Sequence, residues 1–274
     1  MRVNLLTDAP RHNLALMKIA SYHRARGDEV TLNSPQTPCD LSYGSWLFNQ
    51  NYPTDHAGGP AVDPRTRLNG MESVRPDYDL FPIDYSLGYT WRYCPRRCDF
   101  CVVPKQDNPK DHHSIWEFHD PRFDTICLLN NNTFSDPQWF DTFVEIWDAG
   151  LRLMEHGFDL RLMDIEHAKA LKRTKIKGNL HFAWDSMNDE TAIIRGLDLC
   201  RQFNIRGSVY VLVGYDTTRQ EDILRCEVVD WFGLDPYIMP YNGGSRSDRA
   251  FKRAIDLRFY RRYPTITDAL GAYR

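Results

Sequence analysis

The sequence predicts an α/β protein, a partial (β/α)6 TIM-like barrel that follows a small Rossmann-like βαβ region. Two observations support this prediction. Residues 1–32 contain a strand pattern, a helix pattern and a second strand pattern, and from residue 83 onward short apolar runs alternate with helical patterns six times. Alternating units of this kind give parallel strands joined by right-handed crossovers, and six of them can curl into an open barrel.

The opening βαβ unit is predicted from three segments. Residues 2–7 form a short apolar run, residues 14–26 place apolar side chains near helical spacing before Gly27, and residues 29–32 form a second strand-like run. Residues 34–82 are rich in proline and lack a regular pattern, apart from a possible strand at 41–48. We therefore assign residues 1–78 to a truncated Rossmann-like region and its surface connector.

Residues 79–245 are predicted to form the barrel core. Thr218 and Glu221 form a capping box before the apolar Leu224, Val228 and Trp231. Ser135-Asp136-Pro137 supplies a cap and a first-turn proline for another helix. The strands are expected at residues 83–92, 125–130, 159–163, 180–184, 207–213 and 236–239.

Residues 246–274 are predicted to form a C-terminal helical extension. Phe251, Ile255 and Phe259 recur at helical spacing, which favours one amphipathic helix that closes the barrel. The same stretch is rich in arginine and tyrosine, so a surface that binds phosphates and stacks on bases is the alternative.

Composition indicates a globular protein that does not enter membranes. Apolar residues make up 42% of the chain and the formal net charge is −3, so nothing attracts the whole chain to nucleic acid. No apolar run approaches the roughly 18 residues of a membrane span. Seven cysteines, three clustered and four scattered, do not suggest a disulfide framework. We expect a cytoplasmic location.

The run Cys94-Pro-Arg-Arg-Cys98-Asp-Phe-Cys101 is the most informative feature of the chain. Thiolates are the ligands that iron-sulfur clusters and zinc select. A 4Fe-4S cluster normally takes four thiolates, so three leave one iron open. Zinc is the alternative and would need a fourth ligand, such as His112 or His113. A site without metal also remains open.

The cysteine run resembles the radical SAM superfamily signature C-x-x-x-C-x-aromatic-C, with Phe100 in the aromatic position. The resemblance implies that the open iron binds S-adenosylmethionine and that the reduced cluster cleaves it to a 5′-deoxyadenosyl radical. This radical would abstract hydrogen from an unidentified substrate. An electron donor such as flavodoxin or ferredoxin is also implied.

The N-terminal region resembles a shortened form of the Rossmann-like domain that precedes the core in cobalamin-binding relatives. Its order of segments is similar, but the pattern Asp-x-His-x-x-Gly is missing. Asp8 lies four residues before His12, and Asp55 is directly followed by His56. Cobalamin is therefore not expected.

Further cofactor contacts are expected at the carboxyl ends of the predicted strands, where barrel active sites gather. The resemblance implies that polar residues after the fourth strand bind ribose and that a glycine-containing stretch after the fifth packs on adenine. An Asn-rich turn, a helix cap and a strand terminus are the plain alternatives. The residues concerned are Asn130, Asn131, Asn132, Asp185, Ser186, Gly214 and Asp216.

A second class of function is kept as an alternative, namely a nucleic-acid-binding protein stabilised by zinc or by an iron-sulfur cluster without radical chemistry. In this alternative the basic C-terminal tail would bind the nucleic acid. Separately, positive charge surrounds the cysteines at Arg92, Arg96, Arg97 and Lys105, which could stabilise a reduced cluster or attract an anionic substrate, although solvated loop charges are common. No catalytic residue is assigned from the sequence.

Overall fold

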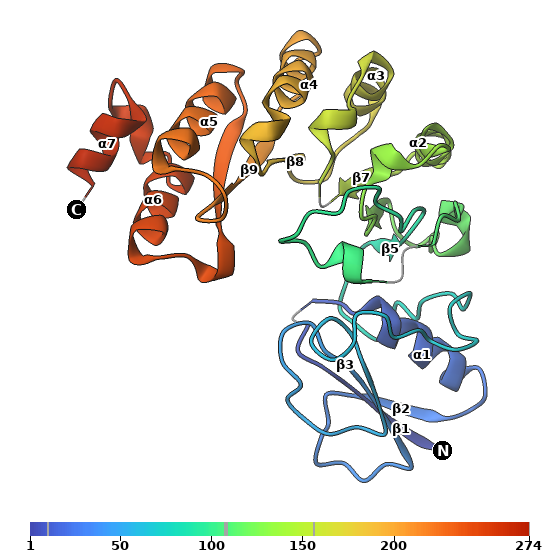
Figure 1. The fold of residues 1–274 in the computed structure, drawn as a ribbon. Coiled ribbons are helices and arrows are strands. Elements are labelled where there is room, and N and C mark those ends of the chain that lie inside the picture. Colours follow the sequence, from blue (N-terminus) through green and yellow to red (C-terminus); the bar gives the residue numbers. More distant parts are fainter. Residues whose placement is uncertain (10, 107–108, 156, 274) are drawn as a thin grey trace. The chain divides into compact units, whose positions relative to one another are not determined.

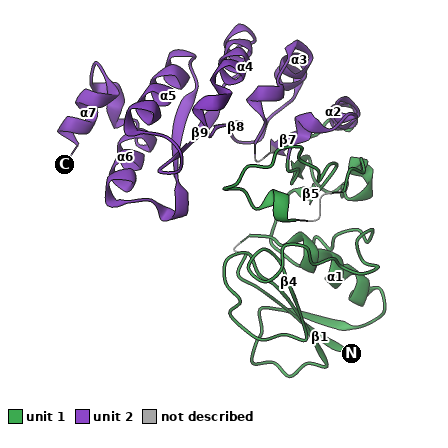
Figure 2. Cartoon of the chain, viewed as in Figure 1, with its two compact units in different colours: residues 1–131, 148–151 green, residues 132–147, 152–274 purple. Residues whose placement is uncertain are grey.

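The computed structural model describes residues 1–9, 11–106, 109–155 and 157–273. Parallel strands and helices alternate along the chain, which confirms the α/β class (Figure 1). The chain divides into two compact units, residues 1–131 with 148–151 and residues 132–147 with 152–274 (Figure 2). Among the helices of the described ranges, none is long and apolar enough to span a lipid bilayer.

A parallel sheet forms the first part of unit 1. Its strands β1 (Arg2–Thr7), β2 (Glu29–Leu32), β3 (Leu41–Ser45) and β4 (His56–Gly58) lie in the order β2-β1-β3-β4, with helix α1 (Leu14–Arg24) after β1. The predicted βαβ unit is therefore present. The possible strand at 41–48 is present as β3, whereas the prediction of a surface connector was wrong at β4, which adds a further strand to the sheet.

A shorter pair of parallel strands, β5 (Ser86–Gly88) and β6 (Thr125–Leu128), completes unit 1. The strand predicted at 83–92 is only three residues long. We expected a helix between β5 and β6, but the described residues of this segment form none. They form two short 3-10 turns instead, η1 (Val103–Lys105) and η2 (Ile115–Glu117). The prolines in the intervening segment remove backbone donors and so oppose a regular helix.

From residue 132 onward, strands and helices alternate in unit 2, and β8, β9 and β10 pair in parallel. Side chains point alternately to the two faces of these strands, so every second residue is buried under the helices. The elements are α2 (Trp139–Asp148), β7 (Arg152–Glu155), α3 (Ile165–Arg173), β8 (His181–Trp184), α4 (Glu190–Gln202), β9 (Ser208–Val213), α5 (Arg219–Trp231), β10 (Asp235–Pro240), α6 (Arg246–Asp256) and α7 (Ile266–Ala272).

The strand predicted at 159–163 was wrong. This segment forms a 3-10 turn, η4 (Leu160–Leu162), and the strand of this part of the chain is β7, which comes earlier. Asp159 caps the turn, since its carboxylate accepts the backbone N–H of Arg161 at 3.1 Å. Such a local bond competes with extended pairing and overrides the apolar alternation.

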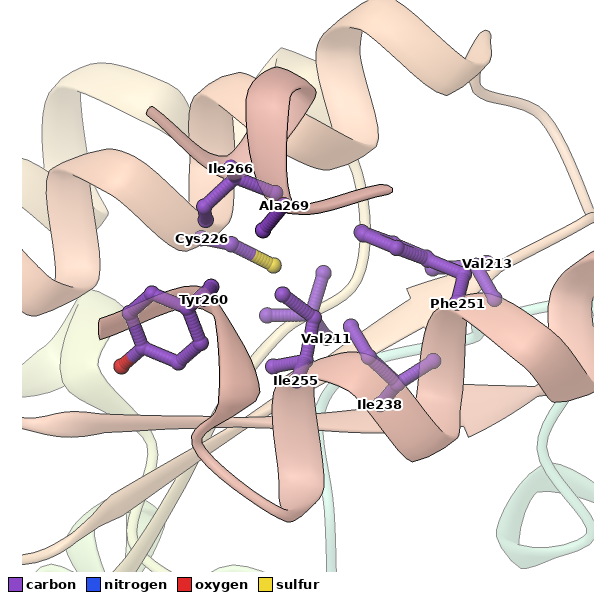
Figure 3. Packing of buried hydrophobic residues seen from close by; sticks show 9 residues of the cluster. All are labelled: Val211, Val213, Cys226, Ile238, Phe251, Ile255, Tyr260, Ile266 and Ala269. Atoms are coloured by element: carbon purple, nitrogen blue, oxygen red, sulfur yellow. The ribbon is translucent and has the colours of Figure 1, made fainter. Parts of the chain in front are cut away.

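One apolar core lies between the β9–β10 part of the sheet and the last helices. Phe251 and Ile255 on α6 are buried in it, as predicted, but the single long helix was wrong: Arg258 adopts a left-handed conformation (φ 55°) that ends it. Phe259 follows this break and is partly buried. Figure 3 shows the buried members, Val211, Val213, Cys226, Ile238, Phe251, Ile255, Tyr260, Ile266 and Ala269.

Helix α5 begins where the sequence predicted, because the Thr218 and Glu221 capping box is present. Its buried face mixes apolar and charged side chains, because Cys226 and Val229 are buried on it together with an ion pair. Leu224 and Trp231 are exposed, whereas the buried positions include Asp222 and Arg225. The helix therefore carries a buried ion pair toward the sheet.

Candidate cofactor site

The three cysteines of the motif lie in the segment between β5 and β6 of unit 1, and each is partly buried. The backbone N–H of Cys101 donates to the carbonyl of Cys98 at 3.0 Å, which places these two residues in one turn. The backbone N–H of Val103 donates to Cys101 Sγ at 3.4 Å. Hydrogen bonds to the ligating sulfurs are among the features that tune the potential of iron-sulfur clusters.

The structure does not bring the three sulfurs together as ligands. Within the described ranges, no three His, Cys, Asp or Glu side chains form a group that could hold a metal ion. The donor set nevertheless fits an iron-sulfur cluster chemically, since it consists of thiols in a partly exposed turn. Phe100 lies in the same turn and is partly buried.

Asn130 anchors the start of the cysteine segment. Its buried Oδ1 accepts the backbone N–H groups of Thr90 (2.9 Å) and Trp91 (3.0 Å), and its Nδ2 donates to Thr90 Oγ1 at 2.8 Å. The Nδ2 of Asn131 donates to the carbonyl of Arg92 at 2.6 Å. The two amides thus fix the backbone that leads into Cys94, a role that the sequence did not indicate.

Asn132 belongs to unit 2 and contacts a charged cluster there. Its Nδ2 donates to Asp159 Oδ2 at 3.0 Å. Arg161 lies between two carboxylates, with Nε 2.7 Å from Asp159 and Nη1 2.9 Å from Asp189. These ion pairs are largely shielded from water, so they hold their geometry better than surface pairs do.

Asp185 directly follows β8 and has an unusual environment. Burial raises the pKa of its carboxyl to about 6, although Arg161 and Arg225 favour the charged form. No hydrogen bond from the described part of the chain reaches this carboxyl. Asp185 lies at the carboxyl end of a strand, and its carboxyl group accepts no hydrogen bond from the described residues, so it can bind a hydroxyl or a cation.

Ser186 and Asp216, predicted from separate strand ends, lie together. Ser186 Oγ donates to Asp216 Oδ2 at 3.2 Å. Gly214 has φ of +74°, and a Cβ atom there would lie 3.2 Å from Asp248 Oδ2, so other residues would be strained at this turn. The carboxylate of Asp248 therefore lies close to the backbone of this turn.

The remaining charged candidates differ in accessibility. Arg97 and Lys105 are exposed beside the cysteines. His119 is buried, its Nδ1 lies 3.0 Å from Ser86 Oγ, and burial lowers its pKa, so it is a structural residue rather than an accessible proton carrier.

No family model matches the chain, and no curated protein matches its sequence. Its structure is similar to the crystal structure of Streptococcus suis SuiB bound to the precursor peptide SuiA, with a TM-score of 0.42 and 13% sequence identity. The match covers 69% of this chain and 46% of that chain, less than half of its length. This similarity is too weak to assign a function.

Sequence reasoning missed Arg225 and Asp222. Arg225 is fully buried and its side chain contacts the ends of β8 and β9. The sequence does place an aspartate three residues before an arginine on the predicted helix. This spacing did not single out the pair, because it is also common for ion pairs on exposed helix surfaces. Only the packing of α5 on the sheet distinguishes this pair from an exposed one.

Proposed function

We propose that this protein is a radical SAM enzyme whose 4Fe-4S cluster is held by Cys94, Cys98 and Cys101. When bound, the cluster and S-adenosylmethionine supply a 5′-deoxyadenosyl radical that abstracts hydrogen from a substrate. The observation that carries the proposal is the spacing of the three cysteines, with Phe100 before the last of them. The substrate is unidentified.

The cysteine segment would act as the cluster loop. Its thiols are partly exposed, and the backbone N–H of Val103 donates to Cys101 Sγ. Asn130 and Asn131 would support the cofactor indirectly, since their amides hold the backbone at Thr90, Trp91 and Arg92. A direct contact of these amides with S-adenosylmethionine stays a prediction.

The strand ends of unit 2 would hold the rest of S-adenosylmethionine. Asp185 can accept a hydrogen bond from a ribose hydroxyl, and Ser186 and Asp216 lie close enough to act on one ligand. Gly214 would allow its backbone to approach adenine.

Electrons would come from a donor such as flavodoxin or ferredoxin in the cytoplasm. The exposed cations Arg97 and Lys105, beside the cysteines, suit an acidic donor protein. Cobalamin is not part of the proposal, because the sequence lacks the histidine pattern that would bind it.

The burial of aromatic residues in the C-terminal region weakens the nucleic-acid-binding alternative. Phe251 and Tyr260, which would stack on bases, are 2% and 5% exposed. Their aromatic faces pack in the core beside α6. We therefore place this alternative second.

The test is the release of 5′-deoxyadenosine. We expect the anaerobically reconstituted protein to release it from S-adenosylmethionine with dithionite. Cys98→Ala should lower this release at least about a hundredfold, because the cluster loses one of its thiolate ligands. Mass spectrometry measures the product, and iron and sulfide are quantified in parallel.

Cys39→Ala is the matched control, since Cys39 is an exposed cysteine outside the motif. It should release 5′-deoxyadenosine like the wild type. Equal release by Cys98→Ala, or none from wild-type protein with its full content of iron and sulfide, would contradict the proposal. Stoichiometric zinc in place of iron would favour the alternative.

A further inference from the structure

Arg225 is a charged side chain in the interior of unit 2. It lies on α5, is 0% exposed, and pairs with Asp222 one turn earlier at 2.6 Å (Figure 1 shows α5 beside β9). Burying a guanidinium is costly even when it is paired. A buried ion pair of this kind often stabilises the fold no more than apolar residues of equal volume would. We therefore examined which backbone groups the Arg225 side chain holds in place.

The contacts of Arg225 join two strand ends. Nη1 donates to the carbonyl of Trp184, the last residue of β8, at 2.7 Å. Nη2 donates to the carbonyl of Leu212 near the end of β9 at 2.7 Å, and to Thr217 Oγ1 at 3.0 Å. A rigid, planar fork of donors suits this task better than a single ammonium group.

The residues that follow these contacts are the candidate ligands. Asp185 follows Trp184 directly, and Asp216 precedes Thr217 directly. The two segments also meet through the Ser186–Asp216 hydrogen bond. Arg225 thus contacts the backbone of both strands next to these segments. The carboxyl group of Asp185 accepts no hydrogen bond from the described residues.

We infer that Arg225 is a positioning residue, whose guanidinium fork fixes the turns after β8 and β9 so that Asp185, Ser186 and Asp216 act on one ligand. The inference rests on the proposed function for the identity of that ligand, S-adenosylmethionine. Because Arg225 is fully buried, its role in this inference is indirect, through the backbone that it holds.

The charge of Arg225 adds a second, measurable effect. A nearby cation favours the ionised form of Asp185, which is the better acceptor for a hydroxyl. Ligand affinity should therefore rise with pH as Asp185 ionises, and loss of the Arg225 charge should move this rise to higher pH. The charged groups that act on Asp185 are Arg161, Arg225, Asp159 and Asp189.

The first measurement needs no ligand. Hydrogen exchange of the backbone amides at residues 185–187 and 213–217 is compared in wild-type protein, Arg225→Lys and Arg225→Met. We expect exchange to rise about tenfold or more in both variants, because the carbonyls of Trp184 and Leu212 lose their donors. Arg201→Met, at an exposed arginine on α4, should leave exchange there unchanged.

The second measurement is the dissociation constant of S-adenosylmethionine against pH for the reconstituted protein. Arg225→Lys should weaken binding on the order of tenfold with an unchanged pH midpoint, because the charge stays and the fork is lost. Arg225→Met should weaken binding and also raise the midpoint. If Arg225 had only a structural role, the two variants would not differ in the pH midpoint of binding.

The outcomes distinguish this inference from the proposed function. Wild-type protein that fails to bind S-adenosylmethionine contradicts the proposed function, and the exchange measurement still tests Arg225. Unchanged exchange and unchanged affinity in both variants overturn the inference. Loss of folding in both variants also overturns it, since Arg225 would then be needed for the fold as a whole. Arg225→Lys keeps the charge beside Asp222 and is expected to fold.

Discussion

Asp185 is a carboxyl group whose surroundings oppose its charge. Burial raises its pKa from 3.8 to about 6. Between these values the folded protein holds a proton that the unfolded chain has lost. The folded state therefore loses stability as the pH rises through this window, and the loss levels off once the pH is well above 6. Such a cost is typical of a residue kept for function rather than for stability.

Asp185→Asn should remove this pH dependence. We expect the variant to be more stable than the wild type at neutral pH, by up to about 3 kcal/mol, because it carries no charge to bury. Near pH 4 the difference should be small. Urea unfolding at the two pH values measures it, with the exposed Glu227→Gln on α5 as control. A pH-independent difference would contradict this account of Asp185.

The residues of the candidate site were only partly predictable. The cysteine spacing is a local pattern, so the sequence displays it directly. The role of Asn130 is different, because its amide bonds to Thr90 and Trp91 some forty residues away in the chain. Only a packed structure fixes such a distant partner.

At the scale of elements, local signals predicted helix starts well and strands less well. The capping box at Thr218 involves only Glu221, three residues later in the chain, so it could be predicted from the sequence. The segment at 159–163 has strand-like alternation, but the Asp159 cap turns it into a 3-10 helix. Two local preferences compete there, and the pattern alone does not say which one wins.

Helix α6 covers part of the edge strand β10. Strand β10 ends its sheet, and the N–H of Ile238 donates to Asp256 Oδ1 at 2.9 Å. Lys252 donates to the carbonyl of Ile238 at 2.7 Å and pairs with Asp256 at 2.7 Å. The two side chains satisfy backbone groups that would otherwise be available to another chain.

Asp256→Ala should therefore destabilise the protein and promote association. We expect a loss of about 1–3 kcal/mol, because the Ile238 N–H loses its acceptor in a partly buried position. Chemical unfolding measures the loss, and light scattering measures association on mild heating. The control Glu227→Ala removes an exposed carboxylate from α5 and should change neither. Wild-type behaviour of Asp256→Ala would contradict the protective role of α6.

For the whole molecule, the cores of the two units do not depend on the cysteine segment. Its described residues, from 93 to 106, hold only the short turn η1 as regular structure. The core consists of apolar side chains such as Leu5 and Leu87 in unit 1 and Val211 in unit 2, all fully buried. Hydrophobic burial of this kind forms without a metal.

Removal of the cluster should consequently leave the fold intact. We expect iron chelation to leave the far-UV circular dichroism unchanged and to lower the melting temperature only slightly. Leu87→Ala, which empties a fully buried position in β5, is the control for a true loss of stability, about 2–5 kcal/mol. Unfolding on chelation would instead indicate a structural metal of the zinc type.

The sequence by itself determined the α/β class, the βαβ opening, most helix starts and the cysteine motif, because each of these depends on residues close together in the chain. The tertiary structure decided that residues 41–58 join the first sheet, that α5 turns Arg225 inward, and that Ser186 meets Asp216. These features depend on contacts between residues far apart in sequence. Their free energy comes from burial and hydrogen bonding that exist only once the chain has packed.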